Sequence, residues 1–391
     1  MIQVGGLFMK IVVAIDSFKG SLTSLEAGQA VRSGVLNACP DAQVTVMPLA
    51  DGGEGTVEAL TLGMGGALQT VTVTGPLGEA VTAQYGILQD KKTAIIEMAA
   101  AAGITLIPEE RRSPLHTTTY GVGEIILDAI HKGCRRFIVG IGGSATNDGG
   151  LGMLQALGYW MLDADGEPVP FGAIGLKALS SIDGSHILPE LQECTFRIAC
   201  DVTNPLCGAT GCSAIFGPQK GATPDDVPLM DSWMKHYAEL SSQNNPQADS
   251  TTPGAGAAGG LGFAFLTYTN ATLESGISIV LAETRLEDHI ADANLVITGE
   301  GRLDSQTVMG KAPIGVAKIA KRHQKPVIAL SGCVAPDARL CNQHGIDAYF
   351  PVLQRISSLA EAMDTASARQ NVIDTAEQVM RLILTARNHF D

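Results

Sequence analysis

Apolar runs of five or six residues recur along this chain, and most of them end in a loop of glycine and polar side chains. The first run, residues 10–15, reads KIVVAI, which is typical of a strand buried on both faces of a parallel sheet. A second run at residues 44–48 repeats the plan. Behind the first run, Thr23 and Glu26 have the spacing of a capping box, which predicts that a helix begins there, and another helix is expected from Val57. This alternation predicts βα units.

The alternation stops between residues 70 and 99, where three consecutive strands are expected, with turns at Gly75 and Asp90. A meander inside a βα series usually marks an insertion or a new domain. The βα pattern resumes at residues 295–330, and a closing helix is predicted over residues 359–387. The two ends of the chain therefore resemble each other, and the middle differs from both.

We accordingly expect an α/β fold made of two α/β domains. The first is a doubly wound, mostly parallel-sheet domain of the Rossmann or flavodoxin kind, built from both termini, residues 1–66 and 291–391. The second is an α/β domain with a mixed sheet, inserted at residues 67–290. The chain of 391 residues fits this division, because one hydrophobic core rarely serves so many residues.

The stretch at residues 137–150, FIVGIGGSATNDGG, combines an apolar strand, a glycine-rich turn and the start of a helix predicted over residues 151–161. Such a turn suits an anion, because glycine lets the backbone approach the ligand and the helix N-terminus favours negative charge. Hydroxyls and a carboxylate in the same turn suggest a phosphate with a metal ion. The candidates are Gly142, Gly143, Ser144, Thr146 and Asn147 for the phosphate, and Asp148 for the metal. The alternative is a tight turn in which Asp148 only caps the helix.

Composition limits the partners of this protein. The net charge of −14 argues against a nucleic-acid surface, which needs a basic patch, and no apolar run is long enough to cross a membrane. The eight cysteines form no CxxC pair or zinc-like cluster, so reduced thiols in a cytoplasmic protein are the simplest interpretation. An anionic small-molecule substrate would have to be bound by local cations and backbone N–H groups.

Acidic and cationic side chains gather in four loops that follow predicted strands. They are Asp16 with Lys19, Asp51 with Glu54, Asp148, and the set Glu300, Arg302, Asp304 and Lys311. Each alone could be a helix cap or a surface pair, but a parallel sheet presents such loops at one edge. Phosphoryl transfer needs carboxylates for Mg²⁺, cations for the moving group and an acceptor for the hydroxyl proton. Asp201 and Lys220 could supply the same from the other domain, which predicts a site in the cleft between domains.

Two other functions stay open on the residues alone. Gly140-x-Gly142-x-x-Ala145 fits the dinucleotide fingerprint, with Asp163 about 20 residues further on, so an NAD-dependent hydroxy-acid oxidoreductase is the main alternative. The polar turn and the lack of a clear second strand before Asp163 speak against it. A non-catalytic sensor of a nucleotide or sugar acid is a third class. A P-loop kinase is excluded, because the chain has no GxxxxGK[ST] sequence.

The chain contains seven motifs in this order: DSFKGSL, ADGGEGT, GIGGSATNDGG, ACDVTNPL, FGPQKGA, PGAGAAGG and VITGEGRLDSQ. Together they resemble the type 1 glycerate kinase family, and the resemblance covers residues 9–387. The resemblance implies two α/β domains, one inserted into the other, ATP-dependent phosphorylation of D-glycerate, and Mg²⁺ as the usual metal. For relatives from enteric bacteria it implies 2-phosphoglycerate as product, so 3-phosphoglycerate remains the alternative. The sequence leaves the oligomeric state open, a homodimer included.

The roles of individual residues rest on their chemistry and not on the resemblance. Triphosphate is expected at the loops around Gly142, Gly143, Ser144, Thr146 and Asn147 and around Gly256 and Gly259, with Lys220; Asp148 and Asp201 are the metal candidates, and Asp201 also counts as catalytic. Lys19 and Arg302 would meet the glycerate carboxylate and the moving phosphoryl group. Asp51 or Asp304 would accept the hydroxyl proton.

Overall fold

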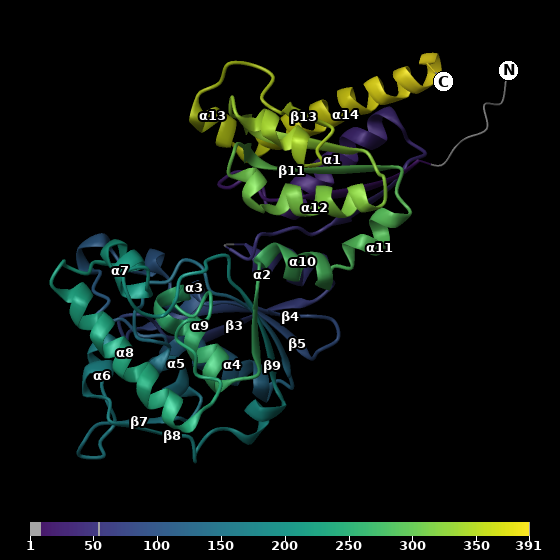
Figure 1. Cartoon of the computed structure of the whole chain (residues 1–391). Coiled ribbons are helices and arrows are strands. Elements are labelled where there is room, and N and C mark those ends of the chain that lie inside the picture. Colours follow the sequence, from purple (N-terminus) through teal and green to yellow (C-terminus); the bar gives the residue numbers. More distant parts are fainter. Residues whose placement is uncertain (1–8, 54, 391) are drawn as a thin grey trace. The chain divides into compact units, whose positions relative to one another are not determined.

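The computed structural model of the chain describes residues 9–53 and 55–390 (Figure 1). Glu54, one of the predicted loop acids, lies outside the described residues. The chain forms two compact units, and each is described by itself below. The first unit runs up to Asp51 and resumes at Val280, and the second comprises Gly52–Ile279. In the part of the chain described, no helix is both long and apolar enough to span a bilayer.

The first unit contains a sheet of five parallel strands in the order β13-β12-β11-β1-β2. The strands are β1 (Lys10–Ile15), β2 (Gln43–Met47), β11 (Leu295–Leu303), β12 (Val327–Val334) and β13 (Ala348–Pro351). Counted along the chain, this is the 2-1-3-4-5 order of flavodoxin-like doubly wound sheets. The doubly wound parallel sheet predicted from the two ends of the chain is therefore confirmed.

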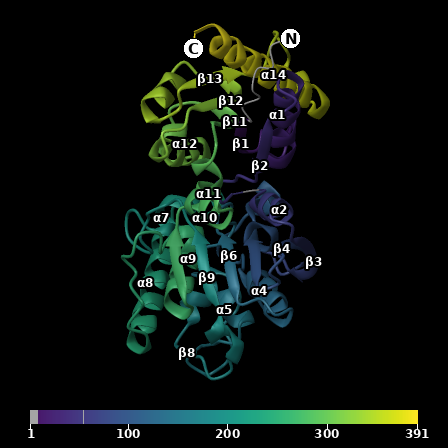
Figure 2. The same ribbon diagram turned by 90° about the vertical axis from the view of Figure 1, so that its right-hand side faces the viewer.

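Helices cover both faces of this sheet. They are α1 (Ser24–Ala38), α11 (Leu286–Ala291), α12 (Ala312–Arg322), α13 (Leu359–Met363) and α14 (Thr365–Phe390). Alternate side chains of β1, namely Ile11, Val13 and Ile15, pack in one core with α1 and α14, which lie side by side in Figures 1 and 2. The intervening Val12 and Ala14 are also buried, on the face contacted by α12. Burial on both faces explains why β1 is continuously apolar.

The sheet fixes where a ligand can bind to the first unit. The chain leaves β1 toward β2 on one side and later returns to β11 on the other, so the switch point of the topology lies between β1 and β11. In doubly wound sheets the loops at this point part and leave a crevice beyond the carboxyl ends of the strands. Asp16 follows β1 directly, and Glu300 lies near the end of β11.

Two buried contacts hold these strand ends in place. The hydroxyl of Ser24, in the first turn of α1, donates to the Ile15 carbonyl at 2.8 Å and accepts from the Leu49 N–H at 3.0 Å, which ties the end of β1 to the loop after β2. In β11, a Cβ on Gly299 would lie 1.8 Å from the Leu330 carbonyl oxygen, so only glycine allows this approach to β12. Both contacts therefore fix the backbone from which the candidate loops start.

The second unit is built on a six-stranded mixed sheet in the order β10-β9-β6-β5-β4-β3. Its strands are β3 (Ala67–Thr74), β4 (Ala80–Ile87), β5 (Thr93–Glu97), β6 (Arg136–Gly140), β9 (Thr195–Ala199) and β10 (Ala271–Glu274). The antiparallel β3-β4-β5 meander is the predicted one, and the four strands from β5 to β10 pair in parallel. The expected mixed sheet is therefore confirmed.

Helices of the second unit enclose a large core against this sheet. They are α2 (Thr56–Gly63), α3 (Ala99–Ala102), α4 (Tyr120–His131), α5 (Leu151–Ala156), α6 (Ala173–Ala178), α7 (Cys212–Phe216), α8 (Asp226–Asn244) and α9 (Ala257–Tyr268), while α10 (Gly276–Glu283) begins in this unit and ends in the first. Figure 2 shows α4, α5 and α9 over one face of the sheet. Phe137 of β6 stacks on Phe196 of β9 with ring centroids 4.7 Å apart, and Phe196 contacts Phe265 of α9. These rings join sheet and helices.

The structure differs from the sequence-based expectations at several boundaries. The units divide at 51/52 and 279/280, and not at 66/67 and 290/291, because α2 packs on β4 and β5 while α11 packs on α12. The helix expected over residues 151–161 was wrong in its second half: α5 ends at Ala156, and β7 (Trp160–Leu162) pairs with β8 (Ser181–Asp183). The intervening Gly158 has a φ of +97°, which a helix cannot continue through.

Candidate active site

A cavity of about 590 Å³ lies at the switch point of the first unit. Its lining consists of Asp16, Ser17, Lys19, Asp51, Glu300, Gly301, Arg302, Asp304, Gln306 and Lys311. Four of the residues predicted to take part in catalysis, Lys19, Asp51, Arg302 and Asp304, are thus brought together. The volume suits a small-molecule ligand, and the lining is unusually rich in charge for a chain with only 17% charged residues.

The loop after β1 presents Asp16 and Lys19 in different environments. The Asp16 N–H donates to the Gly299 carbonyl at 2.9 Å, and the Asp16 Oδ1 accepts from the Ser17 N–H at 2.7 Å, so this carboxylate is buried and fixed. Phe18 is buried in the core and exchanges backbone hydrogen bonds with Leu22. The tight loop between them carries Lys19 on its exposed tip, where the ammonium group can reach a ligand.

The pKa of Asp16 is raised to about 7. Burial is the main cause, and the negative charges of Asp51 and then Glu300 add to it, while Lys19 and the hydrogen bond from Ser17 act in the opposite direction. A carboxyl group with this pKa, lining a cavity, can bind and release a proton near neutral pH. The sequence predicts that Asp16 lies in this loop but indicates no role for it, because the burial of its side chain cannot be read from the sequence.

The loop after β11 holds a second buried carboxylate. Glu300 accepts a hydrogen bond of 2.6 Å from the Thr307 hydroxyl and lies 3.6 Å from the Lys311 ammonium. Burial raises the pKa of Glu300, and Thr307 and Lys311 lower it. Lys311 is also the residue before the first turn of α12, so the helix start fixes its backbone. Glu300 and Lys311 therefore form an ion pair in the cavity wall.

Arg302 and Asp304 form a more exposed pair in the same loop. The Arg302 Nε lies 3.3 Å from the Asp304 Oδ2, and the Asp304 Oδ1 accepts from the Gln306 N–H at 2.9 Å. The side chain of Arg302 is 64% exposed, whereas that of Asp304 is 17% exposed. Asp304 is thus engaged by donors and orients the guanidinium, which keeps further N–H groups for an anion.

Asp148, in the second unit, is completely buried. Its Oδ2 accepts from the N–H and the hydroxyl of Thr119, both at 2.8 Å, and from the Gly152 N–H at 3.2 Å, while its Oδ1 accepts from the Gly150 N–H at 3.1 Å. Burial raises the pKa of this carboxyl, and these hydrogen bonds lower it. A carboxylate surrounded by protein donors favours the capping interpretation over the metal-ligand one.

Lys220 is also buried, and it holds the turn around Ser144 from within. Its ammonium donates to the Ser144 hydroxyl at 2.7 Å and to the Thr146 carbonyl at 2.6 Å, and burial lowers its pKa to about 8. Asn147 donates to the Ser213 hydroxyl at 2.9 Å. Ser144, Thr146, Asn147 and Lys220, all predicted to bind nucleotide, are therefore brought together, but the hydrogen bonds given above join them to other groups of the protein.

The predicted glycines divide into two kinds. Gly256 and Gly259 are buried, and a Cβ on them would lie 2.2 Å from the Pro205 carbonyl oxygen and 2.1 Å from that of Thr146, so they serve close packing of loops. Gly142 and Gly143 are exposed, and a Cβ on Gly142 would meet open space.

Asp201 follows β9 as an exposed carboxylate, and its Oδ1 accepts from the Gly276 N–H at 3.2 Å.

The dinucleotide fingerprint does not have its structural context. Asp163 follows β7, which pairs with the antiparallel β8, and its Oδ1 accepts from the N–H groups of Asp165 and Glu167 in a surface turn. In a dinucleotide-binding unit the acid ends the second parallel strand and faces the ribose. A helix also does not begin at Ala145, because α5 starts at Leu151.

Comparison with known proteins decides the family. The sequence matches the glycerate kinase family over residues 11–384. This chain belongs to the glycerate kinase family. It is 52% identical to glycerate 2-kinase from Escherichia coli K12 over 354 residues, which are 90% of this chain and 93% of the relative. It is 49% identical to glycerate kinase from Haemophilus influenzae Rd over 96% of this chain and 99% of the relative.

A solved structure agrees with the sequence relatives. It is a crystal structure from Salmonella typhimurium LT2 of a protein assigned as glycerate kinase 2, which is 48% identical and superposes with a TM-score of 0.91 over 97% of this chain and 100% of that chain. The predicted family and the two α/β domains are confirmed. The oxidoreductase alternative was wrong, because family and structural context both speak against it.

We expect an acid limb in the pH profile of kcat/KM for glycerate near pH 7, because the cavity carboxyl group of Asp16 loses its proton in this range. Asp51→Asn removes a neighbouring negative charge, so the limb should move to lower pH in this variant. Steady-state kinetics between pH 5 and 9 measure the shift, with the exposed Asp41→Asn as control. An unchanged limb in Asp51→Asn would show that Asp16 does not set it.

Asp148→Asn should destabilise the second unit, because an amide NH₂ would face N–H donors that now bind a carboxylate. The expected loss is about 3 kcal/mol in the free energy of unfolding, typical of a buried, charge-assisted set of hydrogen bonds. Urea unfolding checks it against Asp165→Asn, an exposed neighbour in a turn. Wild-type stability in Asp148→Asn would contradict the capping role.

Proposed function

We propose that this protein transfers the γ-phosphoryl group of ATP to the 2-hydroxyl of D-glycerate, giving ADP and 2-phosphoglycerate. The observation that carries the proposal is the cavity in which the buried Asp16 lies beside Lys19, Arg302 and Lys311. Membership in the glycerate kinase family supports the substrate and the phosphate donor. The name of the Escherichia coli relative, glycerate 2-kinase, supports the position of the phosphoryl group.

Lys19 and Arg302 would bind the anionic groups of the reactants. Glycerate carries a carboxylate, and the transferred phosphoryl group spreads negative charge over three oxygens in the transition state. A planar guanidinium such as that of Arg302 can donate two parallel hydrogen bonds to either group. Lys19 adds a positive charge from the loop after β1, and both side chains line the same cavity. Together they can orient the acid and stabilise the moving charge.

Asp16 is the group that we propose as acceptor of the hydroxyl proton, in place of Asp51 or Asp304. The glycerate oxygen forms a bond to the γ-phosphorus, the bond from that phosphorus to the β,γ-bridging oxygen breaks, and ADP leaves with that oxygen. The hydroxyl proton passes to the Asp16 carboxylate. Asp51 contributes by raising the pKa of Asp16, and Asp304 by orienting Arg302.

Mg²⁺ fits the exposed carboxylate of Asp201 better than the enclosed one of Asp148. This ion commonly takes one or two protein carboxylates and completes its octahedron with phosphate oxygens and water. No group of three or more metal-ligating acids, histidines or cysteines occurs among the described residues, which accords with such a sparse protein contribution. Bound in this way, Mg²⁺ would neutralise phosphate charge. We therefore keep Asp201 as the metal ligand and assign Asp148 to the fold.

Gly142 and Gly143 are the proposed backbone contacts to phosphate in the second unit. Both are exposed, and the absence of a side chain allows a ligand to approach the peptide N–H groups. Ser144, Thr146, Asn147 and Lys220 then support this turn from below through the hydrogen bonds described above. Gly256 and Gly259 support it by close packing.

Phosphorus and proton NMR of the product test the function. The purified protein with Mg-ATP and D-glycerate should form ADP and 2-phosphoglycerate in equal amounts, with no change in the nicotinamide absorbance of added NAD. Formation of 3-phosphoglycerate would contradict the assigned position. A failure of glycerate to stimulate ADP release would contradict the kinase function altogether.

Arg302→Ala should lower kcat/KM for glycerate by about 10²-fold or more, because a preorganised cation at the transferred group is lost. The fold should persist, since the side chain is largely exposed. A coupled ADP assay measures the rate, and the exposed Arg369→Ala, on α14, is the matched control. Near-normal turnover in Arg302→Ala would remove this residue from the site.

Asp201→Asn should raise the Mg²⁺ concentration needed for half-maximal rate, since an amide oxygen binds the ion less strongly than a carboxylate. Titration of Mg²⁺ at fixed ATP compares this variant with the wild type. An identical titration curve would argue that the metal is held by other groups. Asp148→Asn supplies the contrast, with the loss expected in stability and not in the metal requirement.

A further inference from the structure

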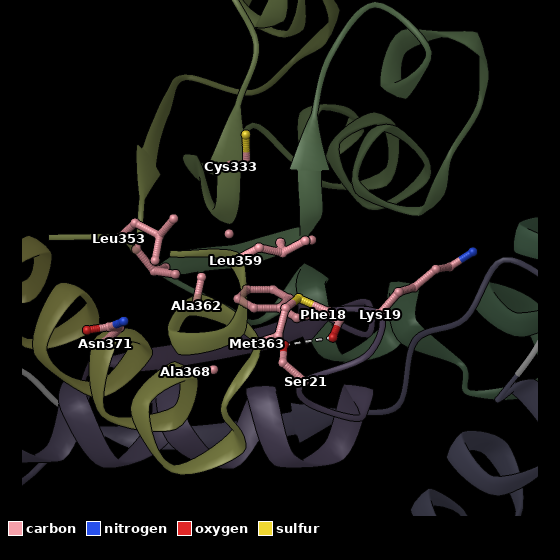
Figure 3. Close-up of a pocket in the computed structure, with 13 residues that line it drawn as sticks. Phe18, Lys19, Ser21, Cys333, Leu353, Leu359, Ala362, Met363, Ala368 and Asn371 are labelled. Atoms are coloured by element: carbon pink, nitrogen blue, oxygen red, sulfur yellow. Dashed lines mark hydrogen bonds between the residues drawn. The ribbon is translucent and has the colours of Figure 1, made fainter. Parts of the chain in front are cut away.

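A second cavity in the first unit, of about 220 Å³, has a wall made mostly of carbon. Figure 3 shows Phe18, Leu359, Ala362 and Met363 gathered around it, with Leu353 at one side. The residues come from the loop after β1, from α13 and from the segment between β13 and α13. None of the residues assigned to chemistry, apart from Lys19, belongs to this wall. The proposed mechanism assigns no ligand to this apolar cavity.

The apolar cavity adjoins the charged one, because Lys19 and Gly301 line both. An elongated ligand that passes these two residues would reach both cavities. Gly301 has no side chain that could separate them, and the Lys19 side chain extends away from the apolar group in Figure 3. The junction therefore lies at the loop tip that carries the ammonium group.

Only one part of the two reactants suits an apolar wall. Glycerate carries a carboxylate and two hydroxyls on three carbons, and the triphosphate is highly charged, so both belong in the charged cavity. The purine of ATP is flat, with apolar faces that pack well against aromatic and aliphatic side chains. Phe18 supplies an almost fully buried ring, and Leu359 is 78% exposed at the rim, where a bound base would cover it.

We infer that the apolar cavity beside Lys19 binds the adenine base of ATP and directs the phosphates into the charged cavity. The inference rests on the proposed function for the identity of the nucleotide. The amide of Asn371, which also lines this cavity, offers both a donor and an acceptor for the edge of the base. Ser21 is engaged otherwise, because its hydroxyl donates to the Phe18 carbonyl at 2.9 Å. The apolar wall thus fits the flat shape of a base, and the amide of Asn371 can bind its polar edge.

Ala362→Phe fills the cavity from α13 and tests this assignment. The KM for ATP should rise by at least about tenfold, since the stacking and burial of one base are lost. The KM for glycerate should stay within about twofold of wild type, because the charged cavity is unaltered. Ala366→Phe adds the same side chain to an exposed position of α14 and is the matched control.

Binding measurements separate the base from the phosphates. By isothermal titration calorimetry, Ala362→Phe should weaken ADP binding while inorganic tripolyphosphate binds as in the wild type, which also shows that the variant is folded. Equal losses for both ligands, or an unchanged ATP KM in a folded and active variant, would overturn the adenine assignment and leave the kinase function intact. Selective loss of ADP binding in a protein that does not phosphorylate glycerate would support the base site and contradict the proposed function instead.

Discussion

The candidate active site of the first unit depends on the burial of Asp16 and Glu300 beside other acidic groups that repel them. Asp16 is held against the end of β11 by its backbone contact to Gly299, with Asp51 and Glu300 near enough to oppose its ionisation. A fold tolerates such a cluster only where other contacts fix the backbone and provide countercharge. The Ser24 hydroxyl, between Ile15 and Leu49, and the Lys311 ammonium beside Glu300 do this. The resulting carboxyl of Asp16 can exchange a proton near neutral pH.

Charged residues take different roles in the two units because their burial differs. In the first unit Arg302 reaches solvent from the cavity rim, and a ligand can complete its hydrogen bonds. In the second, Lys220 and Asp148 lie fully inside the protein, and Thr119, Ser144 and the peptide groups nearby satisfy them. The first arrangement suits chemistry and the second suits a rigid turn. The rigid turn can nevertheless serve function by keeping an exposed glycine pair, Gly142 and Gly143, in a defined place.

Much of the fold could be predicted from local signals. Thr23 and Glu26 form the full capping box at the start of α1, and the KIVVAI run is β1. The helix predicted over residues 151–161 was too long, because the apolar residues Trp160–Leu162 suit a helix as well as a strand. Their pairing with β8 makes them a strand. The roles of the acids were harder to predict, since Asp16, Asp148 and Asp201 all lie in loops that follow strands and have similar sequence surroundings. Their roles separate only through burial and hydrogen-bond partners, which depend on segments remote in sequence, such as Thr119 for Asp148.

The titration of Asp16 tests most directly whether burial and the neighbouring acids raise its pKa. Carbon-13 NMR of a protein labelled at the aspartate carboxyls, with Asp16→Asn to assign the signal, would follow this one group without reference to turnover. We expect a pKa of about 7 for Asp16 in the free protein and a lower value in Asp51→Asn. A pKa for Asp16 near the ordinary aspartate value of about 4 would contradict this expectation, because burial and the neighbouring acids would then not hold its proton near neutral pH.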